Sequence, residues 1–491
     1  MKLSKSKYCD AIQCNKILWL DTNIPEVKGE VTNESILDNG KEVGQTAKEL
    51  FGSHIDIVFN NDLNAMIKAT QKALKNKNVV ITEASFKYQD NFCSVDILKK
   101  ENNAYEIYEV KSSTEFKDIY LDDLSYQTYI LLNLGYAISK ACIIYLNSSY
   151  VRQGSLDLTK LFIIKDVTLE VFTKQKGVKA KINEINKYLI QKKEPEQSLG
   201  MHCVTPYECP FFTHCTKNLE KNNIFDLKGM RNSLKFKLYN QGIYTYKNLL
   251  KEDINDKYKQ QISFELYDEK PIIKKDKIKE FINTLSYPIY FLDFETFQMP
   301  IPKYNNVKPY MQVPFQYSLH IMDKNDLVHK EFLAEADIDP RRSLAEKLVK
   351  DIPLNACTVA YNMSFEKMVI KNLANLYPDL NNHLMNIHGN MKDLMIPFKN
   401  RDYYTKEMHG SFSIKYVLPA LFPNDPSLDY HNLKQVHNGK EAMNSYVSLG
   451  QLNKEKQEYL RNNLLEYCKL DTYAMVKIYE KLIGIIKDYN Q

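Results

Sequence analysis

Two carboxylates stand one residue apart inside an apolar run, and this limits how the C-terminal part of the chain can fold. The run YFLDFETF, residues 290–297, is rich in aromatic residues and comes shortly after Pro288, which predicts a strand of a buried sheet. Side chains alternate along a strand, so Asp293 and Glu295 share one face while Phe294 points to the other. Two unpaired buried anions are costly. A divalent cation with oxygen ligands, Mg²⁺ or Mn²⁺, would balance them; the alternative is a surface strand with two solvated acids.

A metal held by this acid pair needs further acids from elsewhere in the sequence. An apolar strand that runs into a helix supplies Glu366 in the first helical turn, two residues after the plausible N-cap Ser364. Residues 462–482 then predict a long amphipathic helix. Tyr467 and Asp471 are four residues apart on it and would project from one face.

The acid pair, the acid at a helix start and the Tyr-x-x-x-Asp spacing resemble the DEDD exonuclease superfamily, in its tyrosine-containing subclass. The resemblance implies an RNase H-like fold and two-metal hydrolysis of a terminal phosphodiester from the 3′ end, with Tyr467 orienting the attacking water. The third acid is usually Asp and is Glu366 here, with Asp393 as a substitute or helper. Residues 410–421 are a candidate loop and helix on the substrate side. The implied metal ligands are Asp293, Glu295, Glu366 and Asp471.

A second group of charged residues lies in the N-terminal third. Residues 92–100 and 104–113 predict two strands joined by the turn-prone ENN, which makes a β-hairpin. Glu109 and Lys111 share a face of the second strand, and Asp96 on the first strand can meet them. Two carboxylates can hold a metal that polarises a phosphodiester, while the lysine helps to position or activate water. The alternative is a Lys–Glu pair on an exposed hairpin.

The stretch after this hairpin strengthens the interpretation. Residues 121–135 predict a helix with Asp123 and Gln127 on one face. Together these residues resemble the RecB-like branch of the PD-(D/E)XK nuclease superfamily, whose downstream glutamine Gln127 matches. The branch usually carries a metal-binding histidine in its first helix, and the corresponding GKEVG segment has none. The resemblance assigns catalysis to Asp96, Glu109, Lys111 and Gln127, with Asp96 and Glu109 as metal ligands.

Three cysteines recur at a spacing of six in HCVTPYECPFFTHC, and a fourth lies far upstream in AIQCNKILWL. Four thiolates can bind a [4Fe–4S] cluster or a structural Zn²⁺. One remote cysteine with three clustered ones resembles the iron–sulfur staple of certain RecB-like nucleases, so we expect the cluster, with Zn²⁺ as the alternative. Cys9 is a spare candidate for the fourth position. The expected ligands are Cys14, Cys203, Cys209 and Cys215.

The middle of the chain resembles a helix–hairpin–helix. In residues 235–253 an apolar helix ends near Gly242, and Thr245 suits the N-cap of a second helix. Such a motif contacts phosphate through turn amides and a helix N-terminus, without reading sequence. The alternative is a plain helical connector. The basic residues nearby are Lys235, Lys237 and Lys247.

Length and composition set the remaining bounds. A chain of 491 residues suggests about three domains, expected here at residues 1–216, 217–285 and 286–491. The net charge of +5 permits a nucleic-acid partner without demanding one. The sequence has no apolar run long enough to span a bilayer and no signal peptide, so we expect a cytoplasmic protein without a membrane partner, whose thiols stay reduced.

The combination of a RecB-like domain, cysteines, a helical connector and a DEDD-like domain resembles an uncharacterised bacterial family of unknown function. We therefore expect an α/β protein acting as a metal-dependent nuclease with two active sites. The first would cut DNA, and the second would trim 3′ ends of DNA or RNA, with DNA favoured as the partner. One rival is a nucleic-acid-binding or scaffold protein with one or both sites inactive. In another, the C-terminal domain alone is the enzyme and the N-terminal domain holds its substrate.

Overall fold

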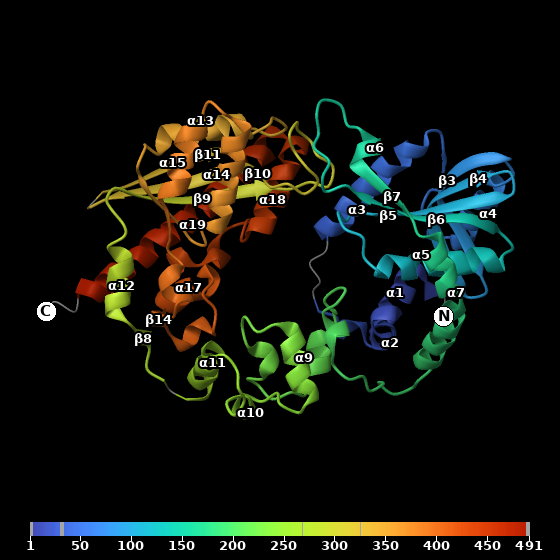
Figure 1. Cartoon of the computed structure of the whole chain (residues 1–491), viewed down its shortest axis with the longest axis horizontal. Helices are drawn as coiled ribbons and strands as arrows, with labels where there is room; N and C mark the ends of the chain where they lie inside the picture. The colour runs from blue at the N-terminus through green and yellow to red at the C-terminus, as the bar shows by residue number, and fades with distance from the viewer. Residues whose placement is uncertain (1–2, 30–33, 268, 325, 488–491) are drawn as a thin grey trace. The chain divides into compact units, whose positions relative to one another are not determined.

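The computed structural model describes residues 3–29, 34–267, 269–324 and 326–487. The chain divides into two compact units. Unit 1 is Met1–Leu219 with Met299–Tyr310, and unit 2 is Glu220–Gln298 with Met311–Gln491. Both units combine helices with a β-sheet (Figure 1), so the predicted α/β class is confirmed. The helical stretch expected as a separate connector belongs to unit 2. Within the described residues, none of the helices has the length and apolar character needed to cross a membrane.

Unit 1 is built on a mixed sheet. As far as the structure describes it, this sheet has seven strands in the order β2-β3-β4-β5-β6-β7, with β1 beside β4. Strands β4 (Asn91–Glu101) and β5 (Ala104–Lys111) form the predicted hairpin, with Glu101 opposite Ala104. Strand β6 (Ala137–Leu146) runs parallel to β5. The other strands are β1 (Leu3–Ser4), β2 (Ile55–Asp56), β3 (Asn78–Tyr88) and β7 (Phe162–Asp166).

Helices cover both faces of this sheet. One core contains Val95 and Ile107 of the sheet, and the core on the opposite face contains Ile97 and Tyr108. The helices of the first core are α1 (Lys5–Gln13), α4 (Leu63–Ala73), α5 (Ile119–Asn133) and α7 (Thr168–Leu189). Helices α3 (Glu34–Lys48) and α6 (Leu158–Leu161) contribute to the second. Besides short 3-10 helices, the described part of the unit also contains α2 (Asn15–Asn23) and α8 (Phe212–Thr216).

A segment distant in sequence, Met299–Tyr310, is part of unit 1. The Arg152 guanidinium donates through Nη1 to the carbonyl of Pro302 at 2.8 Å. The hydroxyl of Tyr310 donates to the carbonyl of Ser112 at 2.5 Å. The chain therefore leaves unit 2 after one strand of its sheet and returns to it before the next.

The sheet of unit 2 has five strands in the described chain, in the order β11-β10-β9-β12-β13. Strand β9 (Ile289–Phe297) lies at its centre, antiparallel to β10 (Val313–Asp323) and parallel to β12 (Cys357–Ala360). The strands at the two edges are β11 (Asp326–Leu333) and β13 (Met391–Asp393). The predicted strand with the acid pair is thus the middle of a sheet.

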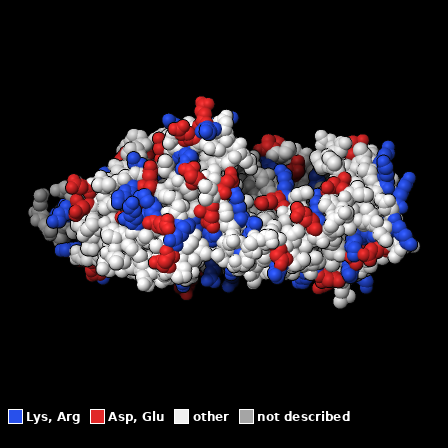
Figure 2. All heavy atoms as spheres, turned by 90° about the horizontal axis from the view of Figure 1, so that it is seen from above, with Lys and Arg blue, Asp and Glu red and all other residues white. Residues whose placement is uncertain are grey.

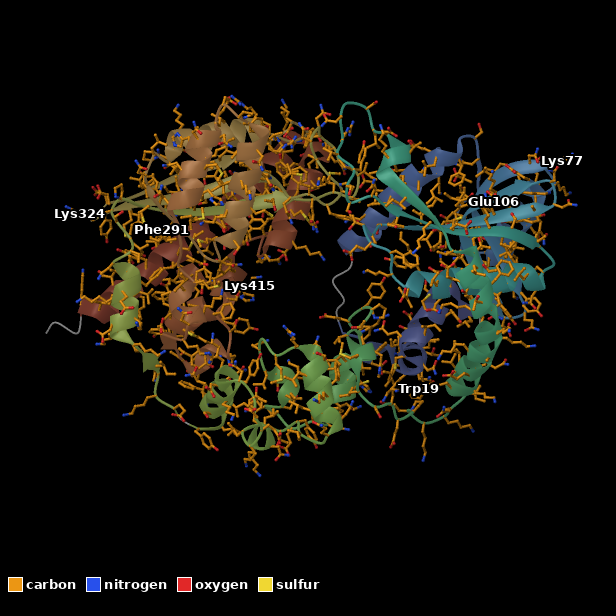
Figure 3. All side chains as sticks on the ribbon, in the orientation of Figure 1. Trp19, Lys77, Glu106, Phe291, Lys324 and Lys415 are labelled. Atoms are coloured by element: carbon orange, nitrogen blue, oxygen red, sulfur yellow. The ribbon has the colours of Figure 1, made fainter. Side chains whose placement is uncertain are left out.

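Alternate side chains of β9 enter two different cores. Leu292 and Phe294 pack on one side, while Phe291, labelled in Figure 3, packs on the other against α19. Asp293 and Glu295 have the same parity as Phe291, so they face α19. Figure 1 shows α13, α14 and α15 on one face of the sheet and α19 on the other. These helices are α13 (Arg341–Asp351), α14 (Ser364–Leu376), α15 (Asn381–Asn390) and α19 (Lys454–Lys487).

A helical segment precedes this sheet. Gly242, with φ of 76°, follows the end of α9, and the Thr245 hydroxyl caps α10 by accepting from the amide of Asn248 at 3.3 Å, as predicted. The helices of the segment are α9 (Asn232–Asn240), α10 (Tyr246–Leu249), α11 (Asp256–Leu266) and α12 (Lys275–Ile282). Besides short 3-10 helices, the described part of unit 2 also contains β8 (Ile272–Ile273), paired with β14 (Tyr403–Tyr404), and α16 (Ile396–Lys399), α17 (Ile414–Leu421) and α18 (Gly439–Ser448).

Candidate active sites

Three of the acids predicted for the C-terminal site meet at one point of unit 2. Asp293 and Glu295 on β9 and Asp471 on α19 offer carboxylate oxygens that all lie within 4.8 Å of one another. The alternation of β9 directs the first two toward α19, and the helix brings Asp471 to them. Tyr467, one turn earlier on α19, is also buried, with 7% of its surface exposed. Three carboxylates at this separation suit a cation with oxygen ligands.

Glu366, the fourth predicted acid, is buried in the first turn of α14 with 3% of its surface exposed. Its Oε2 is buried and has no hydrogen-bond partner within the described chain. The charge of Glu366 contributes to the raised pKa of the β9 acid pair, so it lies near them. The predicted helper Asp393 lies close enough to Glu366 for its charge to add to the effect of burial on the Glu366 pKa, and its Oδ1 accepts hydrogen bonds from the amides of Asn362 (2.9 Å) and Met395 (3.0 Å).

Burial raises the pKa of all four carboxylates. For Asp293 and Glu295 burial is the largest cause and the charge of Asp471 comes next, and their pKa values lie well above the usual range. Burial raises the pKa of Glu366 to about 8 and that of Asp471 to about 6. None of the salt bridges found among the described residues engages these acids. All four carboxylates can therefore be ionised together only when a cation neutralises their negative charge.

Two tyrosines adjoin Asp471. The hydroxyl of Tyr430 donates to its Oδ1 at 2.6 Å, and the ring centroids of Tyr430 and Tyr467 are 6.0 Å apart. Burial raises the pKa of Asp471, and the two hydroxyls partly offset this. The thiol of Cys468 lies 3.9 Å from Oδ2 of Asp293. Sequence reasoning missed Tyr430 because the short turn that carries it has no periodic pattern; an aromatic residue after Asp429 was its one local signal.

A cavity of about 920 Å³ opens beside Asp471 and Tyr467. Helix α17, within the stretch predicted to lie on the substrate side, forms one wall together with the loop that follows. Lys415 of α17, labelled in Figure 3, is exposed at this cavity, and its charge lowers the pKa of Asp471 against the larger effect of burial. Other lining residues are Ile414, Leu418, Phe422, His437 and Asn438. Apolar walls with a few polar groups are typical of ligand sites.

The N-terminal site also assembles, on the sheet face that α1 and α5 cover. Asp96 and Glu109 lie on the neighbouring strands β4 and β5, and Glu109 is 2% exposed. Nζ of Lys111 lies 2.7 Å from Oε1 of Glu109 and also pairs with Asp123. Nε2 of Gln127 donates to Oε2 of Glu109 at 2.7 Å. All the residues predicted from the hairpin and the following helix are therefore in one hydrogen-bonded group.

Lys5 also joins this group and links Asp96 to Glu109. Nζ of Lys5 lies 2.9 Å from Oε1 of Glu109 and 3.3 Å from Oδ1 of Asp96. Asp123, expected on one helix face with Gln127, accepts a hydrogen bond from Nε2 of Gln127 at 3.0 Å. Lys5 is 91 residues from Asp96 and reaches it through the pairing of β1 with β4, which leaves no local pattern in the sequence.

The lysines change the charge state of these acids. Burial opposes ionisation of Glu109, but the charges of Lys111 and Lys5 outweigh it and hold the Glu109 pKa well below its usual range. Burial and the charge of Glu109 raise the pKa of Asp96 to about 7. Unlike the acids of unit 2, these carboxylates already have cationic partners.

The four predicted cysteines line one small cavity in unit 1. Cys14 stands between α1 and α2, Cys203 ends the 3-10 helix Met201–Cys203, Cys209 lies in the loop before α8, and Cys215 is on α8. The amide of Cys209 donates to the carbonyl of Cys203 at 2.9 Å, which holds two of the four together. Cys14 is thus brought to residues almost two hundred positions away.

The surroundings of these sulfurs suit a soft metal centre. Burial raises the pKa of the Cys14 thiol, and hydrogen bonds from the amides of Lys16 and Ile17 act in the opposite direction. His202 also lines the cavity, and its Nε2 is buried with no partner in the part of the chain that the structure describes. Cys9, the spare candidate, instead lies near the charged group around Glu109, whose charge affects its pKa. Four thiols and one imidazole are a donor set for an iron–sulfur cluster or Zn²⁺.

The predicted phosphate contacts of the middle segment are corrected at one position. Lys235 is buried, and its Nζ donates to the carbonyl of Phe225 at 2.9 Å. The Lys235 ammonium is therefore used in a hydrogen bond within the segment and is not presented to a ligand. Lys237 and Lys247 are exposed.

Charge is not concentrated on the face that Figure 2 draws. Basic and acidic side chains are interspersed there, in line with a net charge of +5 from 66 basic and 61 acidic residues. The visible face offers no single basic patch of the kind that dominates many nucleic-acid-binding surfaces.

Comparison with known proteins gives one family and two relatives. The profile of the family described as "Domain of unknown function (DUF2779)" matches residues 290–413. The chain is 29% identical to "Uncharacterized protein MG366" of Mycoplasma genitalium over 303 residues, which are 54% of this chain and 44% of that protein. It is 26% identical to "Uncharacterized protein UU173" of Ureaplasma parvum over 261 residues, or 47% of this chain and 36% of that one. The matched part spans less than half the length of either relative.

Proposed function

We propose that this protein is a metal-dependent nuclease whose unit 2 removes nucleotides from the 3′ end of DNA or RNA, with an RNase H-like fold of the DEDD type. The observation that carries the proposal is the meeting of Asp293, Glu295 and Asp471 within 4.8 Å, on a central strand and a long helix. Buried carboxylates at this spacing are costly unless a cation binds them.

The residues present fit a hard cation. Oxygen donors come from Asp293, Glu295 and Asp471, and Glu366 adds the buried Oε2 that has no other partner within the described residues. Divalent ions bound here would neutralise charge on a phosphodiester and make an attacking water more acidic. Mg²⁺ or Mn²⁺ suits this donor set better than a softer metal.

The chain's own groups would do the positioning. Tyr467, beside Asp471, is suited to orient the attacking water through its hydroxyl. Tyr430 holds the Asp471 carboxylate by its 2.6 Å hydrogen bond. Lys415 borders the cavity and can pair with a phosphate of the strand, while apolar residues such as Leu418 offer a surface to a base.

Unit 1 would supply a second hydrolytic site with a RecB-like PD-(D/E)XK arrangement. Asp96 and Glu109 are its metal ligands, Gln127 orients Glu109, and Lys111 stabilises the charge that develops on the phosphate. The ammonium of Lys5 between the two carboxylates supports the fit, because it stands where a cation is favourable. A second candidate for unit 1 is nucleic-acid binding without cleavage. It is favoured by Lys5 and Lys111, which already neutralise the carboxylates of this group.

The cysteine cavity would hold a [4Fe–4S] cluster, with Zn²⁺ as the alternative. Its ligands would be Cys14 from the beginning of unit 1 and three cysteines from the end of its main segment. A centre bound there would tie the N-terminal helices to the loop around α8, and the contribution would be to stability. No step of hydrolysis is assigned to it.

The test uses end-labelled single- and double-stranded DNA and RNA with Mg²⁺ or Mn²⁺. Stepwise shortening from the 3′ end is expected from the wild type, and Asp293→Asn should reduce it by about 100-fold or more. Glu458→Gln is the matched control, because Glu458 is an exposed acid on α19. Tyr467→Phe should slow the shortening.

A second readout does not depend on activity. Metal that binds the folded state stabilises it by mass action, by about 2.7 kcal/mol at a concentration of 100 Kd. Mn²⁺ should therefore raise the melting temperature of the wild type and of Glu458→Gln, with a smaller rise for Asp293→Asn. Equal stabilisation of all three proteins, or shortening that survives Asp293→Asn, would contradict the proposal for unit 2.

A further inference from the structure

The ammonium of Lys5 lies between the two carboxylates assigned to metal in unit 1. Its Nζ is 2.9 Å and 3.0 Å from the two oxygens of Glu109 and 3.3 Å from Oδ1 of Asp96. The side chains of Lys5 and Asp96 are 23% and 21% exposed, and that of Glu109 is 2% exposed. A lysine that bridges two acids in a half-buried position fills the space that a shared cation would take.

The backbone holds Lys5 in this place. Strand β1 pairs with β4, with Ser4 opposite Phe92, and the hydroxyl of Tyr126 donates to the carbonyl of Leu3 at 2.7 Å. The side chain of Ser4 then caps α1 by accepting from the amide of Lys7 at 3.3 Å. The Lys5 Cα is therefore fixed, while its long side chain can take other rotamers.

The oxygens of both carboxylates are already occupied. Oδ2 of Asp96 accepts from the amide of Val110 at 2.8 Å, and Oδ1 is taken by Lys5. Oε1 of Glu109 contacts Lys5 and Lys111, and Oε2 contacts Lys5 and Gln127. A divalent ion shared by Asp96 and Glu109 needs the oxygens that Lys5 holds.

The charges lead to the same point. Asp96, Glu109 and Asp123 carry three negative charges when ionised, and Lys5 and Lys111 carry two positive ones, which leaves a net charge of −1. A divalent ion added to this group would make it positive and would stand against the ammonium at contact distance. Without the ammonium of Lys5 the group has a charge of −2, which one divalent ion balances.

We propose that Lys5 is a tethered competitor of the metal in unit 1, and that a nucleic-acid phosphate draws its ammonium away so that metal and nucleic acid bind together. The proposal rests on the proposed metal site of Asp96 and Glu109. A phosphodiester is an anion, and the Lys5 side chain, 23% exposed, can turn its ammonium from the carboxylates to such a phosphate and still keep it near the site. Lys5 would then help to hold the strand, while Asp96 and Glu109 become free to bind metal.

The experiment measures Mn²⁺ binding by titration, in full-length protein whose unit 2 site is disabled by Asp293→Asn and Asp471→Asn. Lys5→Met keeps the length of the side chain and removes its charge. Lys7→Met, on the same helix, is the control, and Asp96→Asn reports binding outside the site. In the absence of nucleic acid, Lys5→Met should bind Mn²⁺ at least tenfold more tightly than the parent or Lys7→Met.

A second arm adds a nuclease-resistant phosphorothioate single strand. It should tighten Mn²⁺ binding to the parent and have little effect on that of Lys5→Met. Mn²⁺ should also raise the melting temperature of Lys5→Met more than that of the parent, which checks that the variant is folded. Equal Mn²⁺ affinity of Lys5→Met and the parent would overturn this inference and leave the metal site standing. If neither protein bound Mn²⁺ more tightly than Asp96→Asn does, both this inference and the proposed metal site would be overturned.

Discussion

The hydroxyl of Tyr430 donates a 2.6 Å hydrogen bond to Oδ1 of Asp471, a residue 41 positions later in the chain. This bond joins the turn before α18 to the acid that completes the carboxylate group on α19. It favours the ionised form of Asp471, because a carboxylate that accepts a hydrogen bond loses its charge less readily. In a site where burial raises every carboxyl pKa, this contact works toward metal binding.

Replacing Tyr430 by Phe should weaken metal binding in unit 2, most of all at acidic pH. Without the hydroxyl the pKa of Asp471 rises above its value of about 6, so protons compete better with the metal. A hydrogen bond to a charged group contributes about 1.5 kcal/mol, which corresponds to roughly tenfold in affinity. Titration with Mn²⁺ at several pH values measures this. Tyr459→Phe, at an exposed tyrosine of α19, is the control and should bind Mn²⁺ with the affinity of the wild type. An unchanged Mn²⁺ affinity of Tyr430→Phe would show that the hydrogen bond does not contribute.

Glu366 should make the metal-free protein less stable as the pH rises. Its folded-state pKa is about 8 against an ordinary 4.5, so the folded state keeps a proton that the unfolded chain has lost. The stabilisation is present below about pH 4.5 and is lost as the pH rises through 8, by up to about 1.4 kcal/mol per pH unit. Denaturant unfolding in the presence of a chelator measures this slope. Glu366→Gln should flatten it, and Glu458→Gln should leave it unchanged; an identical slope in Glu366→Gln would contradict the assignment.

Lys111 should be essential for cleavage by unit 1. In a protein whose unit 2 is disabled by Asp293→Asn, Lys111→Ala is expected to reduce endonucleolytic or exonucleolytic cleavage by about 100-fold or more. Lys117→Ala is the control, because Lys117 is an exposed lysine before α5 with no ion pair to the acids among the described residues. Circular dichroism verifies that both variants are folded. Undiminished cleavage by Lys111→Ala would rule out the catalytic role proposed for Lys111.

The cysteine cavity should contain metal when the protein is purified without air. A brown protein with iron and inorganic sulfide would identify the cluster, and a colourless one with a single Zn²⁺ would identify the alternative. Cys14→Ser should lower both the metal content and the melting temperature, since a structural metal contributes to folding. Cys9→Ser is the matched control because Cys9 lies outside this cavity. A metal content that Cys14→Ser does not change would exclude Cys14 as a ligand.

The parts of these sites that follow from local geometry could be predicted from the sequence. Asp293 and Glu295 share a face because strands alternate, and Tyr467 precedes Asp471 by one turn because helices repeat every 3.6 residues. The hairpin of β4 and β5 brings Asp96 near Glu109 for the same local reason. These relationships need no knowledge of how the elements pack.

Residues that depend on long-range packing could not be predicted in this way. Lys5 reaches Asp96 because β1 pairs with β4, and neither strand alone indicates this partner. Tyr430 meets Asp471 from the short 3-10 helix Tyr430–Asn432, which is too short to leave a periodic pattern in the sequence. Lys235 shows the opposite error, since its basic character suggested a ligand contact while its ammonium is used inside the fold.

The membership of Met299–Tyr310 in unit 1 has a consequence for how the protein folds during translation. The main part of unit 1 ends at Leu219, but the partner of the Ser112 carbonyl is Tyr310, which is synthesised roughly 90 residues later. At about 5–20 residues per second this delay lasts on the order of 5–20 s. During that interval the fold of unit 1 is incomplete, because the Pro302 carbonyl that accepts from Arg152 has not yet joined it. A fragment that ends at Leu219 would lack Met299–Tyr310 permanently, so a single cut of the chain cannot separate the two units intact.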